Sequence, residues 1–210
     1  MRNRTKLFCS DLLVPAGLVL VLLGFSMDAL AVDHHREGWF IGLGYGYSPG
    51  AIKISTGQEF EFNEGVTPQL RFGHSFGEHF TAGVDYNGWM FEEGELSDKY
   101  RYSMQSINAA FTWYPGSADS NWGGFYTTAS VGRAWCRGVW VSIEEQQQGE
   151  SEYLSETGLG LAFQLGYEFR ITANTAAGLN AGFNHLEIGK LLFDQVKFAP
   201  INITLNWYWD

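Results

Sequence analysis

The sequence has 210 residues, enough for one domain, and it is rich in glycine and aromatic residues and poor in proline, which favours β-sheet over helix. Its formal net charge is −10. Nucleic-acid binding needs clustered Lys and Arg side chains, so this acidic balance argues against a general nucleic-acid binder. The near-neutral mean hydropathy excludes little, because a barrel with only alternate residues in lipid has the same value.

Residues 1–31 are predicted to be a cleavable signal peptide that precedes a single domain at residues 32–210. A basic start and an apolar run over residues 12–25 lead to the small-x-small site Ala29-Leu30-Ala31. The alternative is a membrane-spanning anchor, but the run is shorter than the ~20 residues that spanning requires, and a proline and a glycine interrupt it. Cleavage leaves 10 basic and 21 acidic residues, a net charge of −11, and a single cysteine, Cys136, so no internal disulfide is possible.

Eight later segments alternate apolar residues with small or polar ones. They are Trp39–Ser48, Thr67–Phe76, Phe80–Met90, Met104–Tyr114, Gly124–Cys136, Gly158–Ile171, Ala176–Leu186 and Pro200–Trp209. Side chains alternate faces along a strand, so a period of two predicts β-strands and does not fit one side of a helix. The fifth segment is the weakest, because Arg133 falls on its apolar face.

The segment Gly158–Ile171 indicates which face lies inside. Every second residue from Leu159 to Ile171 is apolar, and the residues between them are Gly, Ala, Gln, Glu and Arg. Alternation alone also fits a soluble barrel with an apolar core. Rows of glycine and alanine, however, suit a narrow lumen that must leave room for a few long polar side chains. We therefore predict that the apolar face contacts lipid and that the small, polar face lines a packed lumen.

The connections between the segments alternate in length. Those after the second, fourth and sixth segments are short, whereas those over residues 49–66, 91–103, 137–157 and 187–199 are longer and more polar. Such alternation is typical of short periplasmic turns and long external loops, with both termini periplasmic. An even number of strands also closes without an exposed edge, as lipid requires. Aromatic residues predicted to form the interfacial girdles are Tyr45, Tyr47, Trp113, Phe125, Trp135, Tyr167, Phe169, Trp207 and Trp209.

With its signal, its eight strands and the aromatic-ended last strand Ile201 to Trp209, the chain resembles the small outer-membrane barrels of OmpA, OmpX and OmpW type from Gram-negative bacteria. The resemblance covers essentially the whole mature chain. It implies an all-β fold, an eight-stranded antiparallel up-and-down transmembrane β-barrel, in the outer membrane. It also implies contact with outer-membrane lipid and lipopolysaccharide, and recognition of the last strand by the barrel-assembly machinery. That family usually ends on an aromatic residue, whereas Asp210 follows Trp209 here.

Four charged residues are predicted to point into the lumen: Arg71, Asp85, Glu168 and Arg170. Unpaired ions in a narrow lumen are costly, so these side chains should pair with one another or with Asn and Gln neighbours. A gated ion path is the functional alternative. We favour a polar plug, because eight strands leave an interior just wide enough for side chains.

Two functional classes remain open from the sequence. In the favoured one, the barrel is a monomeric structural or surface-interaction protein that acts through its external loops, without cofactor or metal. In the other, it is an OmpW-like conduit for small apolar molecules, which leave through a lateral gap in the wall. Phe40, Trp89, Met104 and Leu186 are then the candidate apolar pocket, although bulky inward residues also serve as packing.

Two further features are weaker candidates for chemistry. The third long connection is acidic and could hold divalent cations that bridge to lipopolysaccharide phosphates, although a solvated loop is the simpler interpretation. Its acidic residues are Glu144, Glu145, Glu150, Glu152 and Glu156. His185 resembles the histidine of lipid A deacylases, but Glu187 stands where that pattern has a serine, so no local nucleophile is present. The sequence therefore does not predict an enzyme.

Overall fold

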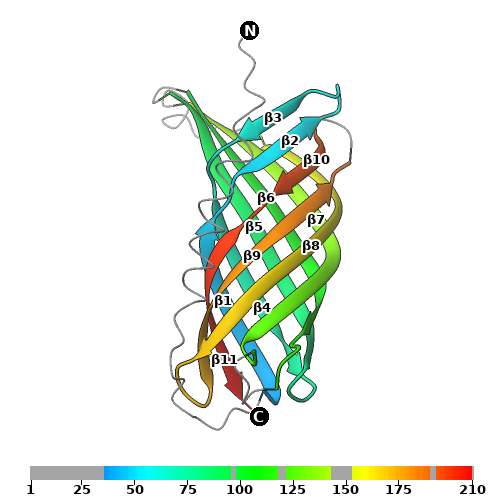
Figure 1. The fold of residues 1–210 in the computed structure, drawn as a ribbon. Coiled ribbons are helices and arrows are strands. Elements are labelled where there is room, and N and C mark those ends of the chain that lie inside the picture. The colour runs from blue at the N-terminus through cyan, green and yellow to red at the C-terminus, as the bar shows by residue number, and fades with distance from the viewer. Residues whose placement is uncertain (1–35, 96–97, 118–121, 143–152, 190–192, 210) are drawn as a thin grey trace. The chain divides into compact units, whose positions relative to one another are not determined.

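A computed structural model describes residues 36–95, 98–117, 122–142, 153–189 and 193–209 (Figure 1). The predicted signal peptide, residues 1–31, lies outside these ranges. The described residues contain eleven strands of one antiparallel sheet. The strands are β1 Gly38–Tyr47, β2 Gly50–Ile54, β3 Glu59–Phe62, β4 Val66–Ser75, β5 Phe80–Glu95, β6 Asp98–Trp113, β7 Phe125–Ser142, β8 Tyr153–Arg170, β9 Thr175–Glu187, β10 Phe193–Phe198 and β11 Ile201–Trp209. Within the same ranges, no helix is long and apolar enough to cross a membrane.

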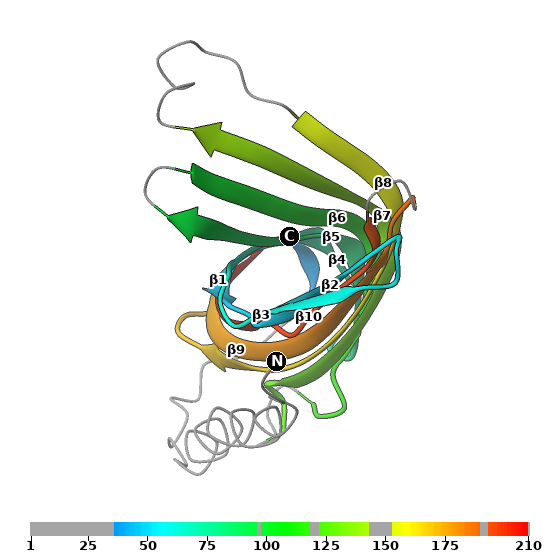
Figure 2. The same ribbon diagram turned by 90° about the horizontal axis from the view of Figure 1, so that it is seen from above.

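Eight of these strands form a closed ring in the order β1-β4-β5-β6-β7-β8-β9-β11, because β11 pairs with both β9 and β1 (Figure 2). The predicted eight-stranded antiparallel up-and-down barrel is therefore confirmed. From Leu43 on β1, the register partners on successive strands lead once around the barrel and end at Lys53 on β2. Lys53 lies ten positions after Leu43 in the chain, and this offset is the stagger of the strands. Such a stagger goes with strands that tilt by about 35–45° to the barrel axis.

The two ends of the barrel differ. At the end called here the turn end, β1 begins, β11 ends and the short connections lie; the opposite end is the loop end (Figure 1). Residues 91–103 and 137–157 were predicted as loops, and this is wrong for all of their described residues, because β5 to β8 continue through them. The apolar alternation stops there because outward residues such as Glu92 and Arg101 are charged, while backbone pairing goes on.

Strands β2, β3 and β10 also occupy stretches that were predicted as loops. The hairpin β2–β3 pairs through β2 with β10, and β10 pairs with the last residues of β9. Pro49 separates β1 from β2, and Pro200 separates β10 from β11, because proline has no N–H for the ladder. These two breaks let the wall bend at the loop end, where the short strands lie (Figure 1).

The faces of the wall are sorted as the alternation predicts. Outward side chains such as Leu43 (58% exposed) and Ile203 (69%) are apolar, while inward ones such as Asn108 and Gln164 (both 1%) are polar. This is the reverse of a soluble protein, in which fully buried polar side chains are the exception. The inside of the barrel is therefore the place to look for polar chemistry.

Candidate functional site

The interior at the turn end is organised around Glu168 on β8, a carboxylate that is 3% exposed. Its Oε1 accepts hydrogen bonds from the Tyr114 hydroxyl (3.0 Å) and the Asn206 amide (2.8 Å). The Tyr208 hydroxyl lies 2.9 Å from Oε2. Three donors from two parts of the wall, Tyr114 directly after β6 and Asn206 and Tyr208 on β11, thus hold one buried carboxylate.

Arg36, which precedes β1, adds a cation to this layer. Its Nε lies 3.9 Å from Glu168 Oε2, and its guanidinium carbon lies 3.8 Å from the centre of the Tyr114 ring. Its Nη1 donates to the Glu78 carbonyl (3.1 Å), and Nη2 donates to the Gly123 carbonyl. Sequence reasoning missed Arg36 because it lies ahead of the first alternating segment, so the period of two could not assign it to a face.

Arg170, also predicted to line the lumen, makes a different kind of contact. Its guanidinium carbon lies 4.2 Å from the centre of the Tyr208 ring. Its three guanidinium nitrogens have no hydrogen-bond partner among the described residues. Arg170 therefore contributes a cation–π contact near the turn end and no hydrogen bond to Glu168.

Arg71 and Asp85 form an ion pair in the next layer towards the loop end. They are register partners on β4 and β5, with 3.2 Å between Arg71 Nε and Asp85 Oδ1, and neither is more than 3% exposed. Arg71 Nη2 also donates to the Thr112 hydroxyl (2.7 Å), which lies 2.8 Å from the Thr128 hydroxyl. A desolvated ion pair is more stable when its other polar atoms also have partners. The threonine hydroxyls supply them for Arg71 Nη2, whereas Asp85 Oδ2 has no hydrogen-bond partner among the described residues.

A layer of amide side chains follows and reaches across the bore. Gln69 Nε2 on β4 donates to Gln164 Oε1 on β8 (2.9 Å), and these strands are four places apart in the ring of eight. Gln164 Nε2 donates to Asn87 Oδ1 (3.1 Å), and Asn180 donates to Gln69 Oε1 (3.0 Å). Amides both donate and accept, so these side chains bond to one another without net charge, and of the three amides on β4, β5 and β8 only Asn87 Nδ2 has no partner among the described residues. Opposite walls of the barrel are thus in direct contact.

Towards the loop end the interior becomes apolar. Trp89, Met104 and Leu186 are fully buried in one cluster, whose other buried members are Ile52, Phe91, Ala134, Cys136, Ile188, Phe193, Val196 and Phe198. The Trp89 indole stacks on Phe198, with 5.6 Å between ring centres, and its Nε1 donates to the Ser48 carbonyl (3.1 Å). Phe62 of the β2–β3 hairpin packs against the same cluster. The hairpin is therefore part of the interior packing.

Phe40 does not belong with the other three residues of the predicted apolar pocket. It packs with Ala176 and Tyr208, and its ring centre lies 5.9 Å from that of Tyr208. β1 begins at the turn end, so an early residue of β1 lies far along the axis from Trp89, a late residue of β5. The predicted grouping of all four is wrong, because alternation assigns a residue to a face and not to a height.

Gly65 provides a test of the packing around Trp89. A Cβ at Gly65 would lie 2.1 Å from Trp89 Nε1, so a larger side chain must displace the indole. We expect Gly65→Val to lower the free energy of unfolding by about 1–3 kcal/mol, measured from urea midpoints in lipid vesicles. Gly138→Val is the control, because its Cβ would meet nothing closer than 3.7 Å. An unchanged midpoint for Gly65→Val would contradict this packing.

The acidic connection is only partly described. Glu156 lies in β8 and not in a loop; it is 6% exposed, and its Oε2 accepts a hydrogen bond from the Phe193 amide (3.3 Å). The loop position predicted for Glu156 is therefore wrong. The other four acidic residues, Glu144, Glu145, Glu150 and Glu152, lie outside the described residues. Within the described ranges, no group of three or more His, Cys, Asp or Glu side chains is placed to hold a metal ion.

His185 lies on the outward face of β9, with its Nε2 3.8 Å from Glu187 Oε1. Its register partners are Leu161 on β8 and Lys197 on β10. Neither partner carries a hydroxyl or thiol. A deacylase mechanism needs such a nucleophile within hydrogen-bond reach of the histidine, and neither of these partners can serve as one.

Comparison with known proteins adds information about the fold. Neither the models of protein families nor the curated protein sequences match this chain. One similar solved structure is that of Ail, the attachment invasion locus protein of Yersinia pestis, in complex with the heparin analogue sucrose octasulfate. Ail is 14% identical to this chain, the alignment covers 82% of this chain and 99% of Ail, and the TM-score is 0.54. Neisserial surface protein A is 13% identical, with 84% and 100% covered and a TM-score of 0.59. The outer membrane protein OprG from Pseudomonas aeruginosa is 15% identical, with 85% and 99% covered and a TM-score of 0.45.

At such identities the similarity to Ail and Neisserial surface protein A concerns the fold, and it extends over nearly the whole length of those two chains. It agrees with the closed ring of antiparallel strands and with the apolar outer face. The chain therefore has the fold of the small eight-stranded outer-membrane β-barrels that its sequence resembles.

Proposed function

We propose that the protein is an integral outer-membrane β-barrel of Gram-negative bacteria with a lumen closed by polar side chains. It acts as a monomeric structural or surface-interaction protein through the connections at its loop end. The exposed apolar outer face supports the membrane location, because a continuous apolar surface of this extent is unfavourable in water. The rigid wall then serves as the scaffold, and the loops carry the specific contacts.

The orientation in the membrane is part of this proposal. Exposed tryptophans near the turn end, Trp39, Trp113, Trp207 and Trp209, support an interfacial aromatic belt at that end. Short connections are typical of the periplasmic side, so the turn end and both termini face the periplasm. The last strand then presents its aromatic end to the barrel-assembly machinery.

The observation that carries the closed lumen is the hydrogen bond between Gln69 and Gln164, because it joins opposite walls. The Arg71–Asp85 pair and the Glu168 network fill the layers between it and the turn end. An ion that follows the axis must break at least three such layers. The polar interior thus supports a structural plug over an ion path.

Fractionation and electrophoresis test the membrane barrel, and conductance tests the plug. We expect the mature protein to sediment with the outer membrane and to migrate differently on gels before and after heating. In planar bilayers we expect it to add no stable conductance step. A water-soluble monomer without detergent would overturn the membrane location, and a steady ohmic conductance would overturn the closed lumen.

An OmpW-like conduit for small apolar molecules is the second candidate, and one feature of the wall favours it. The described register pairing of β4 with β5 ends at Val66 and Met90, whereas β5 continues to Glu95. Among the described residues, β3 pairs with β2 alone, and its Phe62 side chain packs on Phe91, with 4.3 Å between ring centres. An apolar cluster thus lies where the described pairing of β4 with β5 ends.

Cysteine labelling separates these two functions. Single cysteines in place of Met104 and Leu186, in a Cys136→Ala background, should stay unlabelled by small apolar thiol reagents if the cluster is packing. Labelling of both positions in intact outer membranes would favour the conduit. The lipid A-modifying enzyme receives no support from the surroundings of His185.

A further inference from the structure

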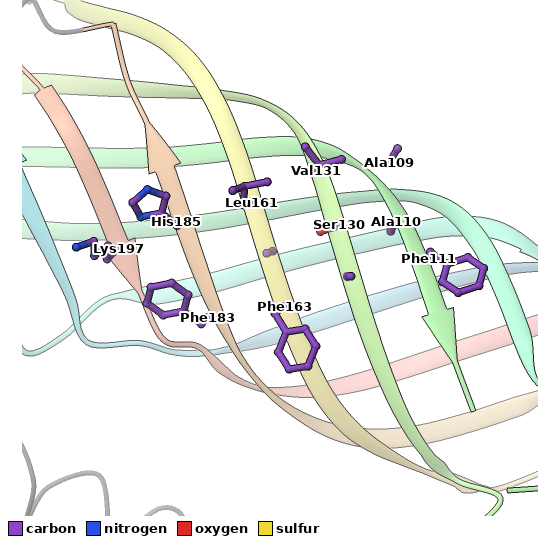
Figure 3. Close-up of a pocket in the computed structure, with 12 residues that line it drawn as sticks. Ala109, Ala110, Phe111, Ser130, Val131, Leu161, Phe163, Phe183, His185 and Lys197 are labelled. Atoms are coloured by element: carbon purple, nitrogen blue, oxygen red, sulfur yellow. The ribbon is translucent and has the colours of Figure 1, made fainter. Parts of the chain in front are cut away.

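The outer wall carries an apolar groove of about 900 Å³ that extends from β6 to β10 (Figure 3). Alanines at positions 109 and 129 leave a depression between larger neighbours. Leu161, Phe163 and Phe183 line the middle of the groove, and His185 and Lys197 stand at one end of it (Figure 3). The groove is therefore apolar along its length and basic at one end.

A single cross-strand row follows this groove. Ala109, Val131, Leu161, His185 and Lys197 are successive register partners on five strands. Its four steps of about 4.8 Å give a length of about 19 Å. Because the strands tilt by about 35–45° to the barrel axis, the two ends of the row differ by roughly 12 Å along that axis. This is half the height of the ~25 Å apolar band of such barrels. The row rises towards the loop end, so the basic end lies nearer the membrane surface than Ala109.

The two basic side chains at the upper end are suited to an anion. Lys197 has no ion pair among the described residues. The nearby carboxylates are Glu187, 3.8 Å from His185 Nε2, and Asp194, which is 3.4 Å from Lys53 Nζ. An ammonium group at the edge of an apolar belt is stabilised by a phosphate, which accepts charge-assisted hydrogen bonds.

We propose that this groove binds one acyl chain of lipid A, the phosphorylated lipid of lipopolysaccharide, and that Lys197 and His185 bind its phosphate. The inference rests on the proposed function, which places the loop end at the outer leaflet, where lipid A is found. The apolar row matches the chain, and the basic pair lies where the headgroup begins. Lys197 supplies a permanent charge, and His185 supplies a ring N–H donor.

The test uses the full barrel in lipid nanodiscs with bis-phosphorylated lipid A and its dephosphorylated form as probes. We expect Lys197→Gln/His185→Gln to bind phosphorylated lipid A at least about tenfold more weakly, because two charge-assisted contacts are lost. Binding of the dephosphorylated form should not change. Ala129→Trp, which fills the depression, should weaken binding of both forms. Arg101→Gln, which removes an exposed basic residue outside the groove, should bind as the unmodified chain does.

Equal affinity of the double variant and the unmodified chain for phosphorylated lipid A would overturn the proposal. An equal loss of affinity in Arg101→Gln would also overturn it, because the phosphorylated lipid would then be attracted to any exposed basic residue. Phosphatidylglycerol that binds as tightly, with the same dependence on Lys197, would overturn the choice of lipid A as the occupant. Fractionation of each variant separates these failures from a failure of the proposed function. A protein that sediments with the outer membrane but shows no preference for phosphorylated lipid A refutes this inference and leaves the proposed function intact.

Discussion

Replacement of Arg71 by methionine is expected to lower the free energy of unfolding by about 3–5 kcal/mol, because Asp85 is left as a buried charge without its partner. Methionine fills much of the space but donates no hydrogen bond to Thr112. The loss should be visible as a lower urea midpoint for the transition from the compact to the heat-denatured gel form in lipid vesicles.

The double variant Arg71→Met/Asp85→Leu distinguishes loss of the pair from a general defect in packing. Removal of both charges leaves no ion to desolvate, so we expect most of the stability to return. Arg101→Gln is the matched control for loss of an arginine, because its partner Glu92 is largely exposed and an exposed pair contributes about 0–1 kcal/mol. An Arg71→Met midpoint equal to that of Arg101→Gln would show that Asp85 is hydrated, and the closed lumen would then be wrong.

Replacement of Trp89 by alanine is expected to cost about 3–5 kcal/mol, since it opens a cavity in the apolar cluster and removes the hydrogen bond to the Ser48 carbonyl. Trp89→Phe keeps the ring contact with Phe198 and should cost about 1 kcal/mol from the lost hydrogen bond. Gel-shift midpoints in urea measure both variants.

Trp122 provides the control for Trp89, because it is 70% exposed. Trp122→Ala should change the free energy of unfolding by no more than about 0.5 kcal/mol. A similarly small change in the free energy of unfolding for Trp89→Ala would mean that the apolar cluster contains unfilled space. That outcome would favour the conduit, since a transported molecule needs space that packed side chains do not leave.

The local pattern of the chain predicted which stretches become barrel strands and which of their faces lies inside. Gly158–Ile171 shows why, because its alternation reports the direction of every second side chain without reference to any other strand. The same pattern failed over residues 91–103 and 137–157. In the first of these stretches outward residues such as Glu92 and Arg101 are charged, so the strands continue without an apolar face to identify them.

The candidate sites required information that is not local. Arg71 and Asp85 were two of four inward charges, and only the register of β4 with β5 makes them partners. Phe40 and Trp89 both point inward but lie in different clusters. Their strands begin at the same end of the barrel, and Phe40 is the third residue of β1 whereas Trp89 is the tenth of β5. Arg36 enters the Glu168 layer from outside any strand.

By itself, the sequence determined the number of barrel strands, their alternating direction and the inversion of polar and apolar faces. These follow from the period of two and from the lengths of the connections, which are properties of neighbouring residues. Tertiary structure alone decided the heights of the inward side chains, their pairing into layers and the outward row from Ala109 to Lys197. The physical reason is that ring closure sets the stagger of the strands, and the stagger decides which distant residues share a level of the barrel.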